Sequence, residues 1–294
     1  MKKFLTAVIA TLSLSGAYAL PLGNPTEASI YTKGIWCEEM DYTDPCDPCF
    51  SWCDAWSLRI GFYGDYVYNR NMKMTREVPN RTRKGDAQRV TLYTNAALLT
   101  LNICDCLDIF STLGASTLTI REDLLFRATL LDFSLHDDHF STAFSWSVGS
   151  RYTLWECGCF GIGAEAQYFR TNTELTALLA TGLSPIYPKP IGAIYHEWQV
   201  GLGASYACSI SCPSISLIPY LGVTYAKANL DPQEDIIDAI PFLTELQPYH
   251  NFQNDKEWSL VVGTTFTLCD VVGVSVEGRF AGEKALHVNG QFRF

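Results

Sequence analysis

The chain has 294 residues, of which 48% are hydrophobic and 18% are charged, close to the composition of a globular protein of one large or two ordinary domains. Its 21 Lys and Arg against 31 Asp and Glu give a formal net charge of −10. This balance excludes a nucleic-acid-binding protein, which needs a basic surface to displace the counterions of the phosphates.

The N-terminus predicts export. Lys2 and Lys3 are followed by an apolar run over residues 4–14 and an Ala-Tyr-Ala triplet that ends at Ala19. This is the pattern of a signal peptide, which we place at residues 1–19. The apolar run is too short for a membrane anchor.

Later segments alternate between apolar and polar residues. No later stretch has the roughly 18 uninterrupted apolar residues of a membrane helix. Instead, one face of the segment from Trp56 carries Trp56, Leu58, Ile60 and Phe62, and the other carries Ser57, Arg59 and Asp65. Segments 141–156, 159–170, 198–206 and 271–280 repeat this period of two, which indicates strands with one apolar face.

Aromatic residues stand at the ends of several apolar faces. The pairs are Trp56 and Tyr68, Phe160 and Tyr168, and Trp198 and Tyr206. Membrane barrels carry aromatic girdles at these two levels. Together with the export signal, they favour a transmembrane antiparallel β-barrel over a soluble β-sandwich.

The last strand, over residues 284–294, supports the same fold. Phe294, Phe292, Val288 and Leu286 share one face, and Arg293, Gln291, Asn289 and His287 share the other. A final aromatic residue is the assembly signal of bacterial outer-membrane barrels, so we assign that role to Phe294. The last strand has to pair with the first, because an unpaired strand edge cannot face lipid.

The cysteines mark one end of the predicted barrel. After a first cluster at Cys37, Cys46, Cys49 and Cys53, they fall in short connections, at Cys104, Cys106, Cys157, Cys159, Cys208, Cys212 and Cys269. The longer connections, 70–87, 121–140, 171–192 and 229–255, contain none. Barrels have short periplasmic turns and longer outer loops, so the cysteine turns are expected in the periplasm. Ten strands place every cysteine turn at the periplasmic end, a requirement that we call the cysteine parity. Residues 121–140 then hold either no strand or two. We expect about twelve strands, with ten to sixteen open.

Three regions follow: a signal peptide over 1–19, a cysteine-rich periplasmic segment over 20–55, and the barrel over 56–294. In an oxidising compartment all 11 cysteines are disulfide candidates, and an odd number leaves at least one for a free thiol or another chain. Zinc binding by Cys46, Cys49 and Cys53 is the lesser alternative, since no matching His is present. We expect no metal and no cofactor.

Several motifs resemble the chlamydial major outer membrane porin family. They are LPLGNP from Leu20, DPCDPC from Asp44, SWCDAW from Ser51, FSWSVGS with LWECGC between 144 and 159, YHEWQ from Tyr195, and HVNGQFRF at the C-terminus. The matches run in one order through nearly the whole mature chain. The resemblance implies a multi-pass outer-membrane porin, a homotrimer surrounded by outer-membrane lipid, and intermolecular disulfides to other cysteine-rich envelope proteins. It also implies four variable surface segments, which the short loops of this chain reduce.

A porin needs a polar lumen and no catalytic residues. We predict that the pore is lined by Arg59, Asp65, Arg151, Glu165, Glu197, Glu277, Arg279 and Arg293. Their mixed signs suggest weak ion selectivity for passive diffusion of small hydrophilic solutes and ions. The run His136-Asp137-Asp138-His139 is the one motif that suits an enzyme, and it could also hold a metal; a solvated loop tip is the simpler interpretation. A structural or adhesive barrel with little channel activity is the alternative function.

Overall fold

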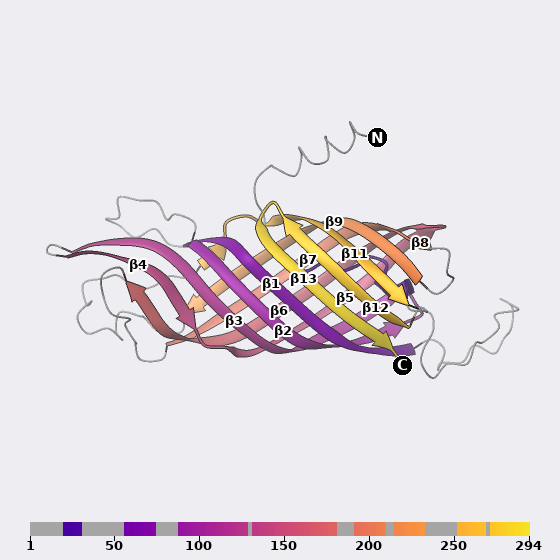
Figure 1. Ribbon diagram of the computed structural model, residues 1–294, viewed down its shortest axis with the longest axis horizontal. Helices are drawn as coiled ribbons and strands as arrows, with labels where there is room; N and C mark the ends of the chain where they lie inside the picture. The colour runs from indigo at the N-terminus through magenta and orange to yellow at the C-terminus, as the bar shows by residue number, and fades with distance from the viewer. Residues whose placement is uncertain are drawn as a thin grey trace, which may run out of the picture.

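The computed structural model is an antiparallel β-barrel (Figure 1). It describes residues 20–30, 56–74, 88–128, 131–180, 191–209, 215–232, 252–268 and 271–294. The elements are α2 (Glu27–Ile30), β1 (Trp56–Met74), β2 (Gln88–Ile103), β3 (Leu107–Ala128), β4 (Leu131–Phe140), β5 (Ala143–Cys157), β6 (Phe160–Ala180), β7 (Ile191–Tyr206), β8 (Cys208–Ser209), β9 (Ile215–Pro232), β10 (Phe252–Asn254), β11 (Trp258–Leu268), β12 (Val272–Phe280) and β13 (Glu283–Arg293).

Three short strands continue longer ones. β4 and β5 both lie between β3 and β6, β8 pairs with β9 as β7 does, and β10 pairs with β9 as β11 does. The described residues therefore form a ring of ten barrel strands, within the predicted range of ten to sixteen. They match the ten strands that the cysteine parity required.

The first and last strands close the ring. β13 pairs with β1 from Arg59↔Arg293 to Arg70↔Glu283, and the Phe294 amide donates to the Leu58 carbonyl at 2.9 Å. Beyond the short β12–β13 hairpin, β10 pairs directly with β1. Both edges of the sheet are thereby removed, as lipid requires.

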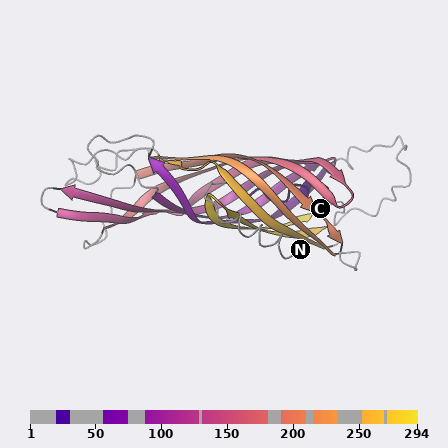
Figure 2. The same cartoon turned by 90° about the horizontal axis from the view of Figure 1, so that it is seen from above.

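The wall extends further than the alternation predicted. Of the two alternatives left open for residues 121–140, no strand or two, the structure has two strand segments, because the end of β3 pairs with β4 from Leu124↔Leu135 to Ala128↔Leu131. Strand β6 runs to Ala180 through a stretch expected as loop, and its last residues pair with β4. The hairpin of β3 and β4 projects from one end of the barrel, as Figures 1 and 2 show.

The opposite end holds the C-terminus and the turns at 104–106 and 157–159, and we call it the cysteine end. The turns are adjacent: the Thr153 amide donates to the Cys106 carbonyl, and the Ala207 amide donates to the Cys159 carbonyl. This brings the described turn cysteines to one end, as the parity predicted. No helix among the described residues is long and apolar enough to cross a membrane.

The outer face is an apolar belt between two sets of aromatic rings. Leu221 and Phe144 are each 64% exposed on this face. At its margin away from the cysteine end, Trp198, Tyr225 and Trp258 are in ring contact across β7, β9 and β11, with centroids 5.5 and 5.2 Å apart. Strand β1, from its first aromatic residue to its last, rises roughly 40 Å, or about 30 Å at a typical tilt, enough for the apolar band of a membrane barrel.

Candidate functional site: the occupied lumen

The alternating polar residues form the inner wall. All eight predicted pore-lining residues point inward, and none is more than 7% exposed. The sequence prediction missed four buried charged residues: Glu27, Arg70, Asp108 and Glu283. Asp108 and Glu283 follow the same alternation as their strands, so extending the period-two count along β3 and β13 would have found them.

A first ion-pair cluster lies toward the end of the lumen opposite the cysteine end, and we call it the Arg70–Arg279 cluster. Arg70 contacts Glu197 at 2.6 Å and Glu283 at 2.7 Å, and the Tyr195 hydroxyl donates to Glu197 at 2.6 Å. Arg279 contacts Asp65 at 2.8 Å, Glu277 at 3.9 Å and Glu283. Because each guanidinium meets carboxylates from two or more strands, the cluster ties opposite parts of the wall together.

A second group of ion pairs lies toward the cysteine end. Arg151 contacts Glu165 at 2.7 Å, and Arg59 contacts Asp108. Arg293, the last of the predicted pore-lining cations, donates to Asp105 at 3.1 Å in the turn between β2 and β3. The predicted lining residues are therefore engaged in pairs within and across strands.

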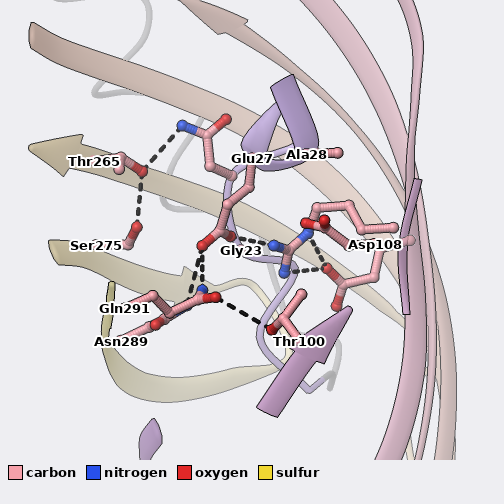
Figure 3. A network of polar contacts seen from close by, with 12 residues as sticks. Gly23, Glu27, Ala28, Thr100, Asp108, Thr265, Ser275, Asn289 and Gln291 are labelled. Carbon is pink, nitrogen blue, oxygen red and sulfur yellow. Dashed lines mark hydrogen bonds and ion pairs between the residues drawn. The ribbon is translucent and has the colours of Figure 1, made fainter. Parts of the chain in front are cut away.

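Residues 20–30 lie inside the barrel, and we call them the lumen segment (Figure 3). This differs from the expectation that residues 20–55 form a periplasmic segment; residues 31–55 lie outside the described residues. Leu22, Gly23 and Glu27 are each buried. The physical reason is that the inner wall supplies partners for the backbone groups of this segment, which would otherwise need water.

The lumen segment is held by hydrogen bonds from many strands. The Leu22 and Gly23 amides donate to the Glu277 carboxylate at 3.1 and 2.8 Å. Asn24 Nδ2 donates to Thr265 at 3.0 Å, and the hydroxyls of Thr26 and Ser205 are 2.7 Å apart. Glu27 accepts from three wall side chains: Arg151, Gln291 and, at 3.5 Å, Asn289.

The local sequence explains the compact turn of the segment. The side-chain oxygen of Asn24 accepts from the Thr26 amide at 3.1 Å. The main-chain carbonyl of Asn24 accepts from the Glu27 amide at 3.0 Å, and this bond starts the single turn of α2. Gly23 has a φ of +65°, and a Cβ there would lie 2.3 Å from Nη2 of Arg151. Only glycine combines this backbone conformation with so close an approach.

Glycines of the wall make room for the segment. A Cβ at Gly163 of β6 would lie 1.8 Å from the Pro25 carbonyl oxygen, and one at Gly222 of β9 would lie 2.3 Å from the Leu22 side chain. Close contacts with the segment also occur at Gly161, Gly201 and Gly203. The inner wall of β6, β7 and β9 is thus shaped to this segment.

An apolar layer crosses the lumen next to the Arg70–Arg279 cluster. It consists of Leu20 from the lumen segment with Val67, Met72, Val90, Leu92, Leu118, Ile120, Phe140, Phe169, Leu175, Ala193, Tyr195, Ala228, Leu230, Phe252 and Ala285 from the wall. Each is at most 8% exposed. The layer and the segment both lie within the described part of the lumen.

Five of the predicted disulfide candidates fall among the described residues and carry free thiols. Cys104, Cys157 and Cys159 are exposed, and Cys106 and Cys208 are partly buried. Partial burial raises the pKa of the Cys106 thiol, and the neighbouring Cys104 and Asp105 raise it further. The remaining candidates, Cys37, Cys46, Cys49, Cys53, Cys212 and Cys269, lie outside the described residues.

The candidate enzyme motif lies on β4. His139 is exposed and its carbonyl accepts from the Thr176 hydroxyl at 2.8 Å, whereas the side chains of residues 136–138 lie outside the description. Within the described part of the chain, no three potential metal ligands lie together.

An apolar outer belt, aromatic margins and a polar inner wall without sheet edges define an outer-membrane β-barrel. A family profile described as Chlamydia major outer membrane protein matches residues 1–87 and 125–182. The major outer membrane porin of Chlamydia psittaci and that of Chlamydia trachomatis serovar E are each 32% identical over 402 residues, with all of both chains covered. The chain belongs to this chlamydial major outer membrane protein family, and it is a multi-pass protein of the outer membrane.

The 402 aligned positions exceed the 294 residues of this chain, so the alignments place gaps in it. Among solved structures, the outer membrane protease OmpT of Escherichia coli is 10% identical with a TM-score of 0.43, and the match covers 82% of this chain and 97% of the OmpT chain. The β domain of the Bordetella autotransporter BrkA is 9% identical with a TM-score of 0.42, and the match covers 82% of this chain and 100% of the BrkA domain.

Proposed function

We propose that the protein is a narrow outer-membrane porin for passive diffusion of small hydrophilic solutes and ions, closed when the lumen segment is in place. One observation carries the proposal. The polar inner wall holds the segment through hydrogen bonds and ion pairs, and no strand pairing among the described residues involves residues 20–30. The segment can therefore leave the lumen without breaking the barrel.

The size of the ring supports a small opening. Eight strands enclose an interior that side chains fill, whereas sixteen to eighteen leave an aqueous channel. A ring of ten lies near the lower limit, and its wall glycines provide the space that the lumen segment occupies. Removal of the segment would leave a passage about as wide as one extended chain, which suits ions and small solutes.

The cysteines support a second, structural role. The exposed thiols of Cys104, Cys157 and Cys159 lie at one end of the barrel, where they can reach other chains. We propose that this end faces the periplasm, that it forms disulfides with other cysteine-rich envelope proteins, and that the barrels assemble as homotrimers. The names of the relatives also support a channel without catalysis, with the HDDH run at 136–139 as a surface feature.

The apolar layer favours a second candidate function, a structural barrel with little or no channel activity. Water and ions enter an apolar constriction poorly, so this layer could keep the lumen closed even without the segment. The two functions differ in whether displacement of the lumen segment gives conductance.

Planar-bilayer recording and liposome swelling with sugars of increasing size distinguish them. Full-length wild-type protein is compared with the Gly163→Ala variant, in which the added Cβ displaces Pro25. A porin conducts, conducts more in the variant, and admits sugars up to a size limit. If both proteins fold but neither conducts nor admits sugar, the porin proposal fails and the structural barrel stands.

A further inference from the structure

The lumen segment is held by side chains that recognise main-chain groups. The Glu277 carboxylate accepts from two consecutive amides, those of Leu22 and Gly23. Gln199 Nε2 donates to the Pro21 carbonyl at 3.0 Å. Farther along, Arg59 Nη1 donates to the Glu27 carbonyl at 3.0 Å and Asn102 Nδ2 to that of Ala28 at 2.9 Å. These contacts depend on a peptide backbone more than on particular side chains.

The Glu27 side chain adds a site for a carboxylate. Its two oxygens accept from the Arg151 guanidinium and from the amides of Gln291 and Asn289, and the carboxylate is fully buried. Arg151 also pairs with Glu165, so it is neutralised on the wall side and presents its remaining N–H groups to the lumen. A charge-assisted contact of this kind discriminates a carboxylate from an amide.

A small cavity and several polar atoms without hydrogen-bond partners lie beside the segment. An internal cavity of about 10 Å³, roughly the space of one water molecule, lies next to Pro21 and Gly23. Tyr63, Glu165 and Asn289 are among the residues that line it. The Tyr63 hydroxyl, Oε1 of Glu165 and Oδ1 of Asn289 have no hydrogen-bond partner within the described structure. All three side chains are at most 5% exposed, so these atoms need either water or a more polar occupant.

We propose that this part of the lumen is a binding site for short acidic peptides, which occupy it as solutes when the lumen segment leaves. The lumen segment is the tethered occupant of the same site. Glu277 accepts hydrogen bonds from amides near the start of the peptide. Arg151 and Gln291 bind an acidic side chain about four residues later, which is the spacing between Gly23 and Glu27. The inference rests on the proposed porin function and names its solute class.

The test uses the full-length Gly23→Ala protein. Its Cβ would lie 2.3 Å from Nη2 of Arg151 at a φ of +65°, so the tethered segment is displaced while the wall that the peptide meets is unchanged. A fluorescent synthetic peptide with the sequence of residues 20–30 is titrated by anisotropy, and its block of the bilayer current is recorded. The comparison peptide carries Gln in place of the Glu at position 27. We expect the acidic peptide to bind about tenfold more tightly or better, since it makes one more charge-assisted contact.

Wall variants locate the site. Arg151→Gln and Gln291→Ala should each reduce the preference for the acidic peptide, whereas Arg293→Gln should not, because Arg293 pairs with Asp105 away from the segment. Heat-modifiable electrophoretic mobility reports folding of each variant. Equal binding of the two peptides, or a preference that survives in both Arg151→Gln and Gln291→Ala, overturns the inference. Current without peptide binding refutes the binding site and leaves the porin function standing. Peptide binding without current leaves the binding site standing but refutes the porin function, and with it the role of the peptide as a solute.

Discussion

The substitution Gly163→Ala tests the packing of the lumen segment against the wall. The new Cβ would lie 1.8 Å from the Pro25 carbonyl oxygen and 2.7 Å from its carbonyl carbon, where ordinary contacts begin at 3.4 Å. Gly163 is paired on both sides, with Thr153 of β5 and Gly203 of β7, so the wall cannot retreat. Relief therefore requires the lumen segment to move by roughly 1.5 Å.

Overpacking of this kind costs about 1–3 kcal/mol. The overlaps with Pro25 are much closer than the contact with the wall, where the Cβ would lie 3.0 Å from the Tyr152 carbonyl oxygen. The substitution therefore penalises the occupied state more than the empty barrel, and it should raise the fraction of barrels with a displaced segment by roughly five- to a hundredfold. Amide hydrogen exchange of residues 20–30, measured by mass spectrometry, should accelerate by that factor, and the open probability in planar bilayers should rise. The control is Gly290→Ala, where the nearest atom to the Cβ lies 4.0 Å away. If a folded Gly163→Ala protein exchanges as slowly as the control, the segment does not pack against Gly163.

Three further predictions concern the wall, the belt and the thiols. Arg70→Met removes the ion-pair partner of the buried Glu197 carboxylate and leaves Glu283 with Arg279 alone, so it should destabilise the folded barrel by about 3–5 kcal/mol in urea unfolding from lipid vesicles. Lys73→Met, on the same strand and 52% exposed, should cost less than about 1 kcal/mol, and equal losses would contradict the cluster. Leu221→Arg places a charge in the lipid-facing belt and should cost roughly 2–4 kcal/mol, whereas a neutral result would mean that this face meets water. Because its pKa is raised, the Cys106 thiol should react with iodoacetamide more slowly than the exposed Cys157 thiol at pH 8. The difference in rate should shrink as the pH rises. Equal rates at pH 8, measured by mass spectrometry of the labelled peptides, would contradict this prediction.

The alternation of residues predicted the wall well. The outward positions of Trp56 and Leu58 and the inward positions of Ser57 and Arg59 follow from a period of two, which reflects the pleat of a strand and needs no tertiary information. Pairing of the last strand with the first was also predicted, because a lipid-embedded sheet has to close. The family resemblance is confirmed by relatives that span the whole chain.

Arg70 shows where a period of two fails. A bulge between Val67 and Asn69 shifts the register of β1 against β13, so even-numbered residues point inward beyond it. Alternation counted from Trp56 puts Arg70 on the lipid face, yet it is 1% exposed in the centre of an ion-pair cluster. Bulges depend on the partner strand and leave little trace in a single sequence.

The lumen segment could not be predicted from local pattern. Its partners are far away in the sequence: Glu277 lies 255 residues after Leu22, and Ser205 lies 179 after Thr26. A signal is nevertheless present in the inward-facing glycines Gly163 and Gly203, on strands whose other inward residues are polar. Small residues facing a lumen indicate that something else fills it.

The central claim is that the barrel is closed by its own lumen segment, and a covalent lock tests it most directly. The hydroxyls of Thr26 and Ser205 are 2.7 Å apart, so paired cysteines at these positions are within reach of a disulfide. The oxidised Thr26→Cys/Ser205→Cys protein should show no conductance in planar bilayers, and reduction should restore the wild-type openings. Wild-type protein and the Thr26→Cys single variant should open under both conditions. Conductance of the oxidised, fully cross-linked protein equal to that of wild type would contradict the central claim.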